Sequence, residues 1–138
     1  GAAEGLIHSV RLITTKPPQG LAGAPWLLEQ GIRLDDLRAP VKVFEGNALD
    51  AVRAFPANVN VAAALSLAGI GAQRTQVQVW ADPAATRNAH RIEVESDSAR
   101  FSMSIESEPS SNPRTSQSAV NSVIALLRKL GAALRVGT

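Results

Sequence analysis

Two histidines are the side chains in this sequence best suited to moving protons near neutral pH, because imidazole titrates there without help from its surroundings. His90 lies between a polar loop and an expected strand, and loops held by a rigid sheet often carry catalytic groups. His90 is therefore a candidate catalytic residue, with an ordinary surface histidine as the alternative. His8 falls on the apolar face of another expected strand, beside Val10 and Leu12, which favours a hydrogen-bonded histidine of the core or an interface.

Cationic and amide side chains at other positions could hold an anionic ligand. Arg87 comes shortly before His90 in the same loop. Lys16 precedes two prolines and could bind a carboxylate from a rigid turn, with a solvated lysine as the alternative. Asn58 and Asn60 flank the start of an expected helix, where asparagine either caps the helix or presents its amide to a ligand. Lys16, Arg87 and Asn58 are therefore the candidate substrate-binding residues.

The first half of the chain predicts one strand and two or three helices. Residues 6–15 are rich in β-branched side chains and favour a strand that ends at the prolines after Lys16. A loop over residues 17–25 leads to a short helix over 25–30, and Phe44-Glu45-Gly46 leads into a helix over 47–54. Residues 58–69 are apolar on nearly every side, which is typical of a buried helix.

The second half predicts three more strands and a final helix. Apolar and polar residues alternate over 76–79, 91–95 and 101–106, which favours an antiparallel sheet with one apolar face, in the form of a three-stranded meander. Residues 113–130 show helical spacing of apolar side chains after an Asn-Pro start. We therefore expect a single α+β domain over residues 1–138, with a mostly antiparallel sheet of about four strands and helices on one face. The polar face, which carries Trp80, is either solvated or a subunit interface.

Composition excludes several classes of protein. The 138 residues carry a formal net charge of +2 and no cysteine, which excludes disulfides, thiolate nucleophiles and cysteine-bound metals. With two histidines we expect no metal site. No basic stripe joins the scattered aromatic residues, so we expect no nucleic-acid partner. No apolar run reaches membrane length and no signal peptide is visible, so we expect no membrane partner and a cytoplasmic location. No glycine-rich phosphate loop is present either, so the chain encodes no complete dinucleotide site.

Four ordered motifs nevertheless resemble one enzyme family. The chain resembles the C-terminal domain of L-aspartate dehydrogenase over nearly its whole length. The motifs that carry this resemblance are Phe44-Glu45-Gly46, the F-P-A-N-V-N run at 55–60 with its apolar continuation, Ala81-Asp82-Pro83 with Arg87-Asn88-Ala89-His90, and Asn112-Pro113-Arg114-Thr115-Ser116. The Lys16-Pro17-Pro18 element fits the same family.

The resemblance implies a reaction and several residue roles. Members of the family oxidise L-aspartate with NAD or NADP to iminosuccinate, which gives oxaloacetate and ammonia or feeds NAD biosynthesis. Their catalytic histidine corresponds to His90, and their cofactor contacts correspond to Asn60 and, after the Rossmann domain, to Ala2. The resemblance also implies a homodimer, through the polar face of the sheet. Because the Rossmann half is not in these 138 residues, we expect this chain alone to lack dehydrogenase activity.

Two other interpretations remain open at this point. A different amino-acid or keto-acid oxidoreductase with the same two-domain plan could use His90 on another substrate. A non-catalytic dimerisation module could also carry the same fold. The preference for NAD or NADP depends on a residue of the Rossmann domain, which reads the ribose 2′ position.

Overall fold

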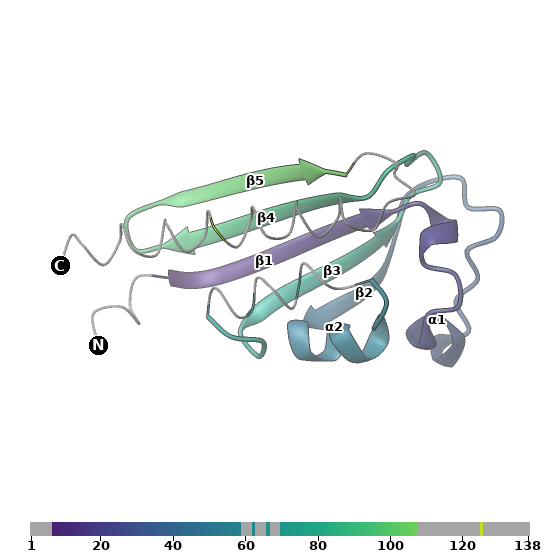
Figure 1. The fold of residues 1–138 in the computed structure, drawn as a ribbon, viewed down its shortest axis with the longest axis horizontal. Coiled ribbons are helices and arrows are strands. Elements are labelled where there is room, and N and C mark those ends of the chain that lie inside the picture. Colours follow the sequence, from purple (N-terminus) through teal and green to yellow (C-terminus); the bar gives the residue numbers. More distant parts are fainter. Residues whose placement is uncertain (1–6, 59–61, 63–65, 67–69, 108–124, 126–138) are drawn as a thin grey trace.

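The computed structural model describes residues 7–58, 62, 66, 70–107 and 125, and their strands and helices form an α+β arrangement (Figure 1). The helices are α1 (Pro25–Gln30) and α2 (Ala48–Ala54), with a 3₁₀ turn at Pro18–Gly20. The strands are β1 (Ile7–Lys16), β2 (Val41–Asn47), β3 (Thr75–Ala81), β4 (Ala89–Ser96) and β5 (Arg100–Glu106).

The five strands form one sheet in the order β2-β3-β1-β4-β5, with β1 at its centre. β1 runs parallel to β3, and every other neighbouring pair is antiparallel. The predicted α+β class with a mostly antiparallel sheet is therefore confirmed. The predicted three-stranded meander is wrong, because β1 lies between β3 and β4 and only β4 and β5 form a hairpin. β2 was not expected, since residues 44–46 were interpreted as the approach to a helix.

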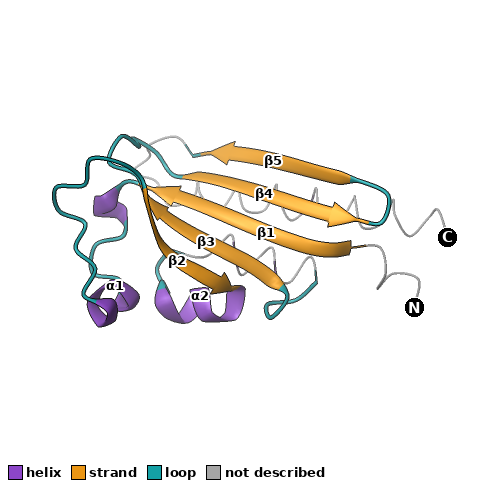
Figure 2. Ribbon diagram, turned by 180° about the vertical axis from the view of Figure 1, so that it is seen from behind, coloured by secondary structure: helices purple, strands orange, loops and turns teal. Residues whose placement is uncertain are grey.

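One face of the sheet carries the core. Alternation along the three central strands points one row from each strand inward. These rows contain Val10 and Leu12 of β1, Val77 and Val79 of β3, and Ile92 and Val94 of β4, all buried. The other face is exposed in Figure 2, where no described helix lies over the sheet. We call this second face the open face, and we define it by the side chains of Arg11, Ile13, Gln78, Trp80, Arg91, Glu93 and Glu95.

The two described α-helices gather at the β2 edge. Asn47 caps α2, because its side chain accepts a hydrogen bond from the Asp50 backbone N–H at 2.8 Å. Trp26 of α1 packs edge-on against Phe44 at 5.4 Å, and Phe44 packs edge-on against Phe55 at 5.8 Å, measured between ring centroids. Gly46 leaves space for the Phe44 ring, because a Cβ there would lie 3.0 Å from Phe44 Cζ.

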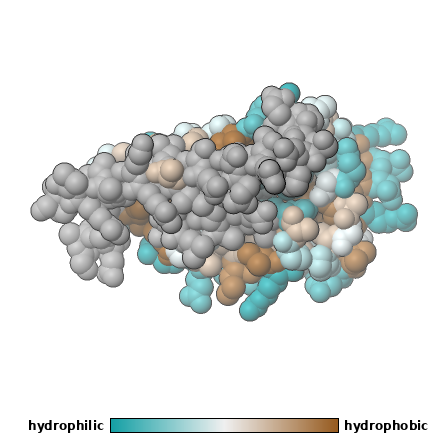
Figure 3. Space-filling view, in the orientation of Figure 1, coloured by the Kyte–Doolittle hydropathy of each residue, from teal (hydrophilic) through white to brown (hydrophobic). Residues whose placement is uncertain are grey.

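Apolar side chains also reach the surface on the helical side. Leu49 and Val52 of α2 are exposed, and Figure 3 shows brown, hydrophobic residues over α2 at the lower edge of the molecule. None of the described helices is long and apolar enough to cross a membrane.

Two helices predicted from the sequence lie largely outside the described residues. Ala62 and Ser66 are the described members of the first, at 58–69, and both are helical and buried. Ser66 Oγ donates a hydrogen bond to the Ala62 carbonyl at 2.7 Å, one helical turn earlier. Ala125 is the described member of the second, at 113–130, and it is helical.

Candidate active site

His90 lies near the start of β4, on the core side of the sheet, with 8% of its surface exposed. Its register partner on β1 is Thr14, and the two side chains meet on the same face. His90 Nδ1 and Thr14 Oγ1 are 3.1 Å apart, which is a hydrogen bond between two buried groups. The histidine that the sequence singled out for catalysis is therefore held in a defined orientation by the neighbouring strand.

Strand alternation explains why polar groups collect here. Val10 and Leu12 of β1 point into the core, and the same row continues with Thr14 and then Lys16 at the end of the strand. Ile92 and Val94 of β4 form the matching row, and His90 continues it in the same direction because β4 is antiparallel to β1. The apolar core thus changes to a polar cluster at one end of the sheet. We call Thr14, Lys16 and His90 the β1–β4 cluster.

Lys16 is the unusual member of this cluster, because only 9% of its surface is exposed. No described side chain forms an ion pair or a hydrogen bond with its ammonium group. Burial lowers the pKa of Lys16, since the charged form loses hydration. A buried ammonium without a carboxylate partner in the described part of the chain is suited to binding an anion.

Burial and the charge of Lys16 also determine the ionisation of His90. Desolvation of the ring, followed by repulsion from the Lys16 cation, lowers the pKa of His90 to about 4. The imidazole is therefore neutral at pH 7, with one protonated nitrogen and one that can accept a proton. The cluster thus combines a proton acceptor with a site for an anionic group.

Asn58 lies close to this cluster through the loop after β1. Its side-chain amide donates a hydrogen bond to the Gly20 carbonyl at 2.9 Å. Gly20 in turn packs near Lys16, since a Cβ at Gly20 would lie 3.9 Å from Lys16 Cβ. Asn58 therefore anchors the turn that follows Lys16, and this is the contact the structure records for its amide.

Arg87 lies on a different side of the sheet. Its guanidinium is 3.7 Å from the Glu106 carboxylate, and both residues line a hollow of about 460 Å³ with Thr15 and Ala89. Thr15 and Ala89 point away from the core face, because they alternate with Thr14 and His90. The structure therefore brings Lys16 and His90 together, with Asn58 nearby, and places Arg87 apart from them. Ala2 and Asn60 lie outside the described residues.

His8 does not occupy the core position predicted for it. The register of β1 against β4 shifts between Ile7 and Ser9, so His8 leaves the buried row and its side chain is exposed. It pairs with Asp97 at the surface. The core alternative for His8 is therefore wrong, because the register shift breaks the alternation from which it was predicted, and the interface alternative stays a prediction.

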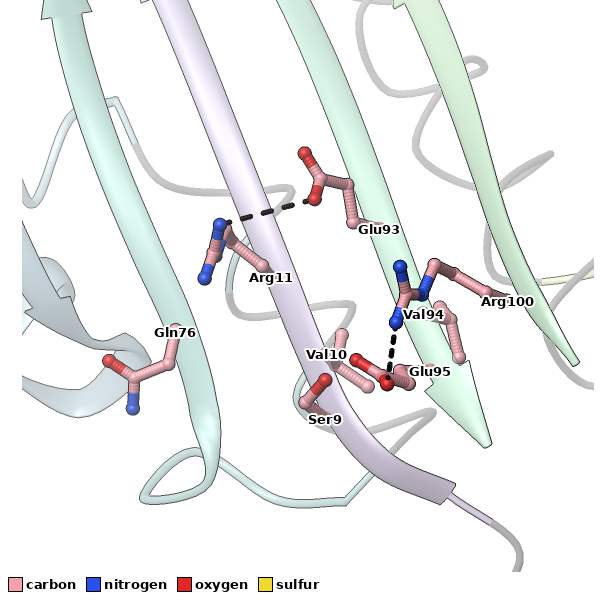
Figure 4. A pocket seen from close by; sticks show the side chains of 8 residues that line it. All are labelled: Ser9, Val10, Arg11, Gln76, Glu93, Val94, Glu95 and Arg100. Carbon is pink, nitrogen blue, oxygen red and sulfur yellow. Dashed lines mark hydrogen bonds and ion pairs between the residues drawn. The ribbon is translucent and has the colours of Figure 1, made fainter. Parts of the chain in front are cut away.

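The open face carries a second hollow, of about 250 Å³, shown in Figure 4. In that view Arg11 of β1 reaches toward Glu93 of β4, at 4.0 Å, and Arg100 of β5 reaches toward Glu95, at 3.0 Å. Ser9 and Gln76 complete its polar lining. Its arginines and glutamates are paired with one another, in contrast to Lys16, so we consider the β1–β4 cluster the better site for an anion.

The fold and the cluster together define an α+β domain with a candidate proton-transfer and anion-binding site. The profile of the family "Aspartate dehydrogenase, C-terminal" matches residues 1–130, so the chain belongs to this family.

Curated relatives agree with that assignment. The chain is 61% identical over 137 residues to an L-aspartate dehydrogenase of Bradyrhizobium diazoefficiens, an alignment that covers 99% of this chain and 49% of that protein. It is 51% identical over 133 residues to an L-aspartate dehydrogenase of Methanosarcina mazei, covering 96% of this chain and 49% of that protein. The chain thus spans about half the length of the curated relatives it matches.

A solved structure gives the same result for the fold. The crystal structure of aspartate dehydrogenase from Thermotoga maritima superposes with a TM-score of 0.64 at 29% identity. The superposition covers 94% of this chain and 46% of that one. The match therefore extends over nearly all of this chain and over less than half of its structural relative.

Proposed function

We propose that this chain is the substrate-binding and catalytic half of an NAD- or NADP-dependent L-aspartate dehydrogenase. Membership of the family and the names of the relatives support the proposal. The 138 residues are then one domain, and an upstream Rossmann domain supplies the rest of the enzyme. The reaction converts L-aspartate to iminosuccinate, which hydrolyses to oxaloacetate and ammonia or enters NAD biosynthesis.

The observation that carries the proposal is the buried Lys16 ammonium beside the neutral His90 imidazole. L-Aspartate carries two carboxylates and one ammonium group at pH 7. A carboxylate paired with Lys16 would place the rest of the substrate near His90, because the two residues share one end of the sheet. Asn58, at the turn after Lys16, stays a candidate for a further substrate contact, whereas Arg87 lies on the other side of the sheet and does not fit this placement.

His90 takes up the proton in this scheme. The substrate ammonium loses one proton to a nitrogen of His90, which leaves a neutral amine. The hydrogen on C2 then leaves as hydride while the nitrogen lone pair forms the carbon–nitrogen double bond of the iminium. The bound pyridine nucleotide supplies the hydride acceptor. Water then adds to the iminium carbon, and loss of ammonium gives the keto acid.

The substrate carboxylate would also act on the charge beside this base. In the free protein the Lys16 cation contributes to the low pKa of His90. A substrate carboxylate against Lys16 would offset that positive charge and so weaken the second of the two causes that lower the pKa of His90.

The described residues fit the substrate better than they fit a whole dinucleotide. The β1–β4 cluster offers a cation, a hydroxyl and an imidazole, and the sequence contains no glycine-rich phosphate loop. We therefore assign most of the cofactor to the upstream domain. Asn60 and Ala2 are the proposed contacts from this chain.

We also propose a homodimer that forms through the open face, in a cytoplasmic enzyme. Ile13 and Trp80 support this interface, because both are only half-buried among the charged side chains of the open face. The cysteine-free composition is compatible with a reducing compartment.

The test restores the upstream chain and measures absorbance of the reduced nicotinamide with L-aspartate, L-glutamate and L-alanine. We expect kcat/KM to be highest for L-aspartate, and no turnover above the blank for the 138-residue chain alone. A full-length protein that prefers another amino acid would support the related oxidoreductase instead. A protein without turnover on any of them would support the non-catalytic module.

A further inference from the structure

Thr14 is the one polar side chain in the β1–β4 cluster that the proposed mechanism has not used. It is 4% exposed, and β1 places it directly opposite His90. Its hydroxyl oxygen lies 3.1 Å from His90 Nδ1. Threonine is β-branched and has few rotamers, so this contact comes from a side chain with little freedom to move.

We propose that Thr14 is a positioning residue that accepts a hydrogen bond from His90 Nδ1 and so leaves Nε2 as the nitrogen that takes the substrate proton. This inference rests on the proposed function, since it assigns the proton acceptor of that reaction to one atom. In a neutral imidazole only one nitrogen carries hydrogen, and the hydrogen bond made by one nitrogen determines the state of the other.

The neighbours of His90 support this role for Thr14. Its register partner on β5 is Ile105, which is apolar, and Ile92 beside it on β4 is apolar as well. Lys16 is a cation on the same face and has only hydrogens to donate. Among these described neighbours, the Thr14 hydroxyl is the group that can accept a hydrogen bond from Nδ1.

The same hydrogen bond serves both states of the base. Before proton transfer, Nδ1–H donates to Thr14 Oγ1 and Nε2 has a free lone pair. After transfer, Nε2 carries the new proton and Nδ1–H still donates to Thr14. The ring therefore keeps its orientation through the proton transfer, with no reorganisation of its partner.

The test is ¹⁵N NMR of the histidine side chains in the full-length protein at pH 7, with His90 assigned by the signals lost in His90→Gln. We expect Nδ1 of His90 to give the shift of a protonated nitrogen and Nε2 that of an unprotonated one. In Thr14→Val the proton moves toward Nε2, and kcat for L-aspartate falls on the order of 10-fold with little change in KM. Thr14→Ser keeps an acceptor and restores both readings.

Thr75→Val is the matched control. Thr75 is a fully buried threonine of β3 on the same face, and its hydroxyl donates to the Gly71 carbonyl at 2.7 Å. Its loss perturbs the same sheet without touching His90, so the parent tautomer is expected. An unprotonated Nδ1 in the parent overturns the inference, and so does a Thr14→Val variant with the parent tautomer and kcat. A parent that does not oxidise L-aspartate refutes the proposed function instead, while the NMR reading still tests the hydrogen bond.

Discussion

In water an imidazole is half-charged near pH 6.5, whereas the pKa of His90 is lowered to about 4. The first cause is burial on the core face of the sheet, and the second is the nearby charge of Lys16. Lys16 is itself buried without a described anionic partner, so the protein holds both groups in states that cost stability. Buried ionisable groups with shifted pKa values are characteristic of functional sites, where a bound ligand supplies the missing partner.

The lowered pKa of His90 predicts a loss of stability in mild acid. Below pH 6.5 the unfolded chain binds a proton at His90, while the folded chain does not until about pH 4. The unfolded state therefore binds more protons in this interval, and the free energy of unfolding falls as the pH falls. We expect His90 to account for a loss of up to about 3 kcal/mol between pH 7 and pH 4.

Urea unfolding followed by tryptophan fluorescence measures this effect at each pH. His90→Gln is the reference, because glutamine does not titrate and the remaining pH dependence belongs to other groups. The difference between the two pH profiles isolates His90. Parallel profiles for the parent and the variant would contradict the assigned pKa.

Replacing Lys16 by methionine separates function from stability. Lys16→Met removes the proposed carboxylate partner, so KM for L-aspartate is expected to rise roughly 10- to 100-fold. The same change removes a buried, unpaired charge and is expected to raise Tm. Lys42→Met is the control, because Lys42 pairs with Glu45 at the surface and such pairs contribute little. A variant with unchanged KM would remove Lys16 from the substrate site.

At the scale of elements, β1 does most to build the site. It supplies Lys16 and Thr14, and its register against β4 brings His90 to them. The loop after β1 is then tied down by the Asn58 amide on the Gly20 carbonyl. The positions of the Lys16, Thr14 and His90 side chains therefore depend on the central strand β1 and on the turn that Asn58 anchors.

This anchor makes Asn58→Ala informative. Loss of its hydrogen bond to Gly20 is expected to lower the free energy of unfolding by about 1 kcal/mol. KM for L-aspartate is also expected to rise, since the turn beside Lys16 loses its restraint. Gln73→Ala, at an exposed turn, serves as the control in urea unfolding and in kinetics. A variant as stable as the parent would show that the contact does not anchor the turn.

Much of this element structure could be predicted from the sequence. The prolines and Gly31 bound α1 at Pro25–Gln30, and alternation marks β3, β4 and β5. Two failures, the missed strand β2 and the core position predicted for His8, have a common cause in irregular registers. A shift between Lys42 and Phe44 buries both Val43 and Phe44 and hides β2, and a shift near Ile7 exposes His8.

The site was only partly predictable for a related reason. Residue type was enough to select His90 and Lys16, because each can do chemistry wherever the fold places it. The sequence did not single out Thr14, because its proposed role depends on its register with His90. The two residues lie on neighbouring strands that are far apart in sequence. Alternation assigns a residue to a face but does not identify the neighbouring strand, which is also why the meander was wrong.

At the scale of the whole molecule, the two faces of the sheet have different roles. The core face carries the β1–β4 cluster at one end, and the described helices lie near β2 (Figure 2). The open face presents paired charges around Ile13 and Trp80. We assign substrate to the first face and a second copy of the chain to the other. Dimerisation would then leave the proposed active site accessible to the upstream domain.

A charge placed at the centre of the open face tests this assignment. Ile13→Lys puts an unpaired ammonium into the proposed interface and is expected to convert a dimer of the full-length protein into monomers. Leu28→Lys is the matched control, because Leu28 is 74% exposed on α1. Light scattering at micromolar concentration reports the mass of each. A dimeric Ile13→Lys variant, or a monomeric parent, would contradict the interface.

One pair of variants tests whether His90 is the catalytic base for oxidation of L-aspartate. His90→Ala and His8→Ala each remove one of the two histidines of this chain, and His8 is exposed and paired with Asp97. In the full-length enzyme we expect kcat for L-aspartate to fall about 10²-fold or more in His90→Ala and to stay near the parent value in His8→Ala. A His90→Ala enzyme that binds the cofactor and turns over L-aspartate like the parent would contradict the account.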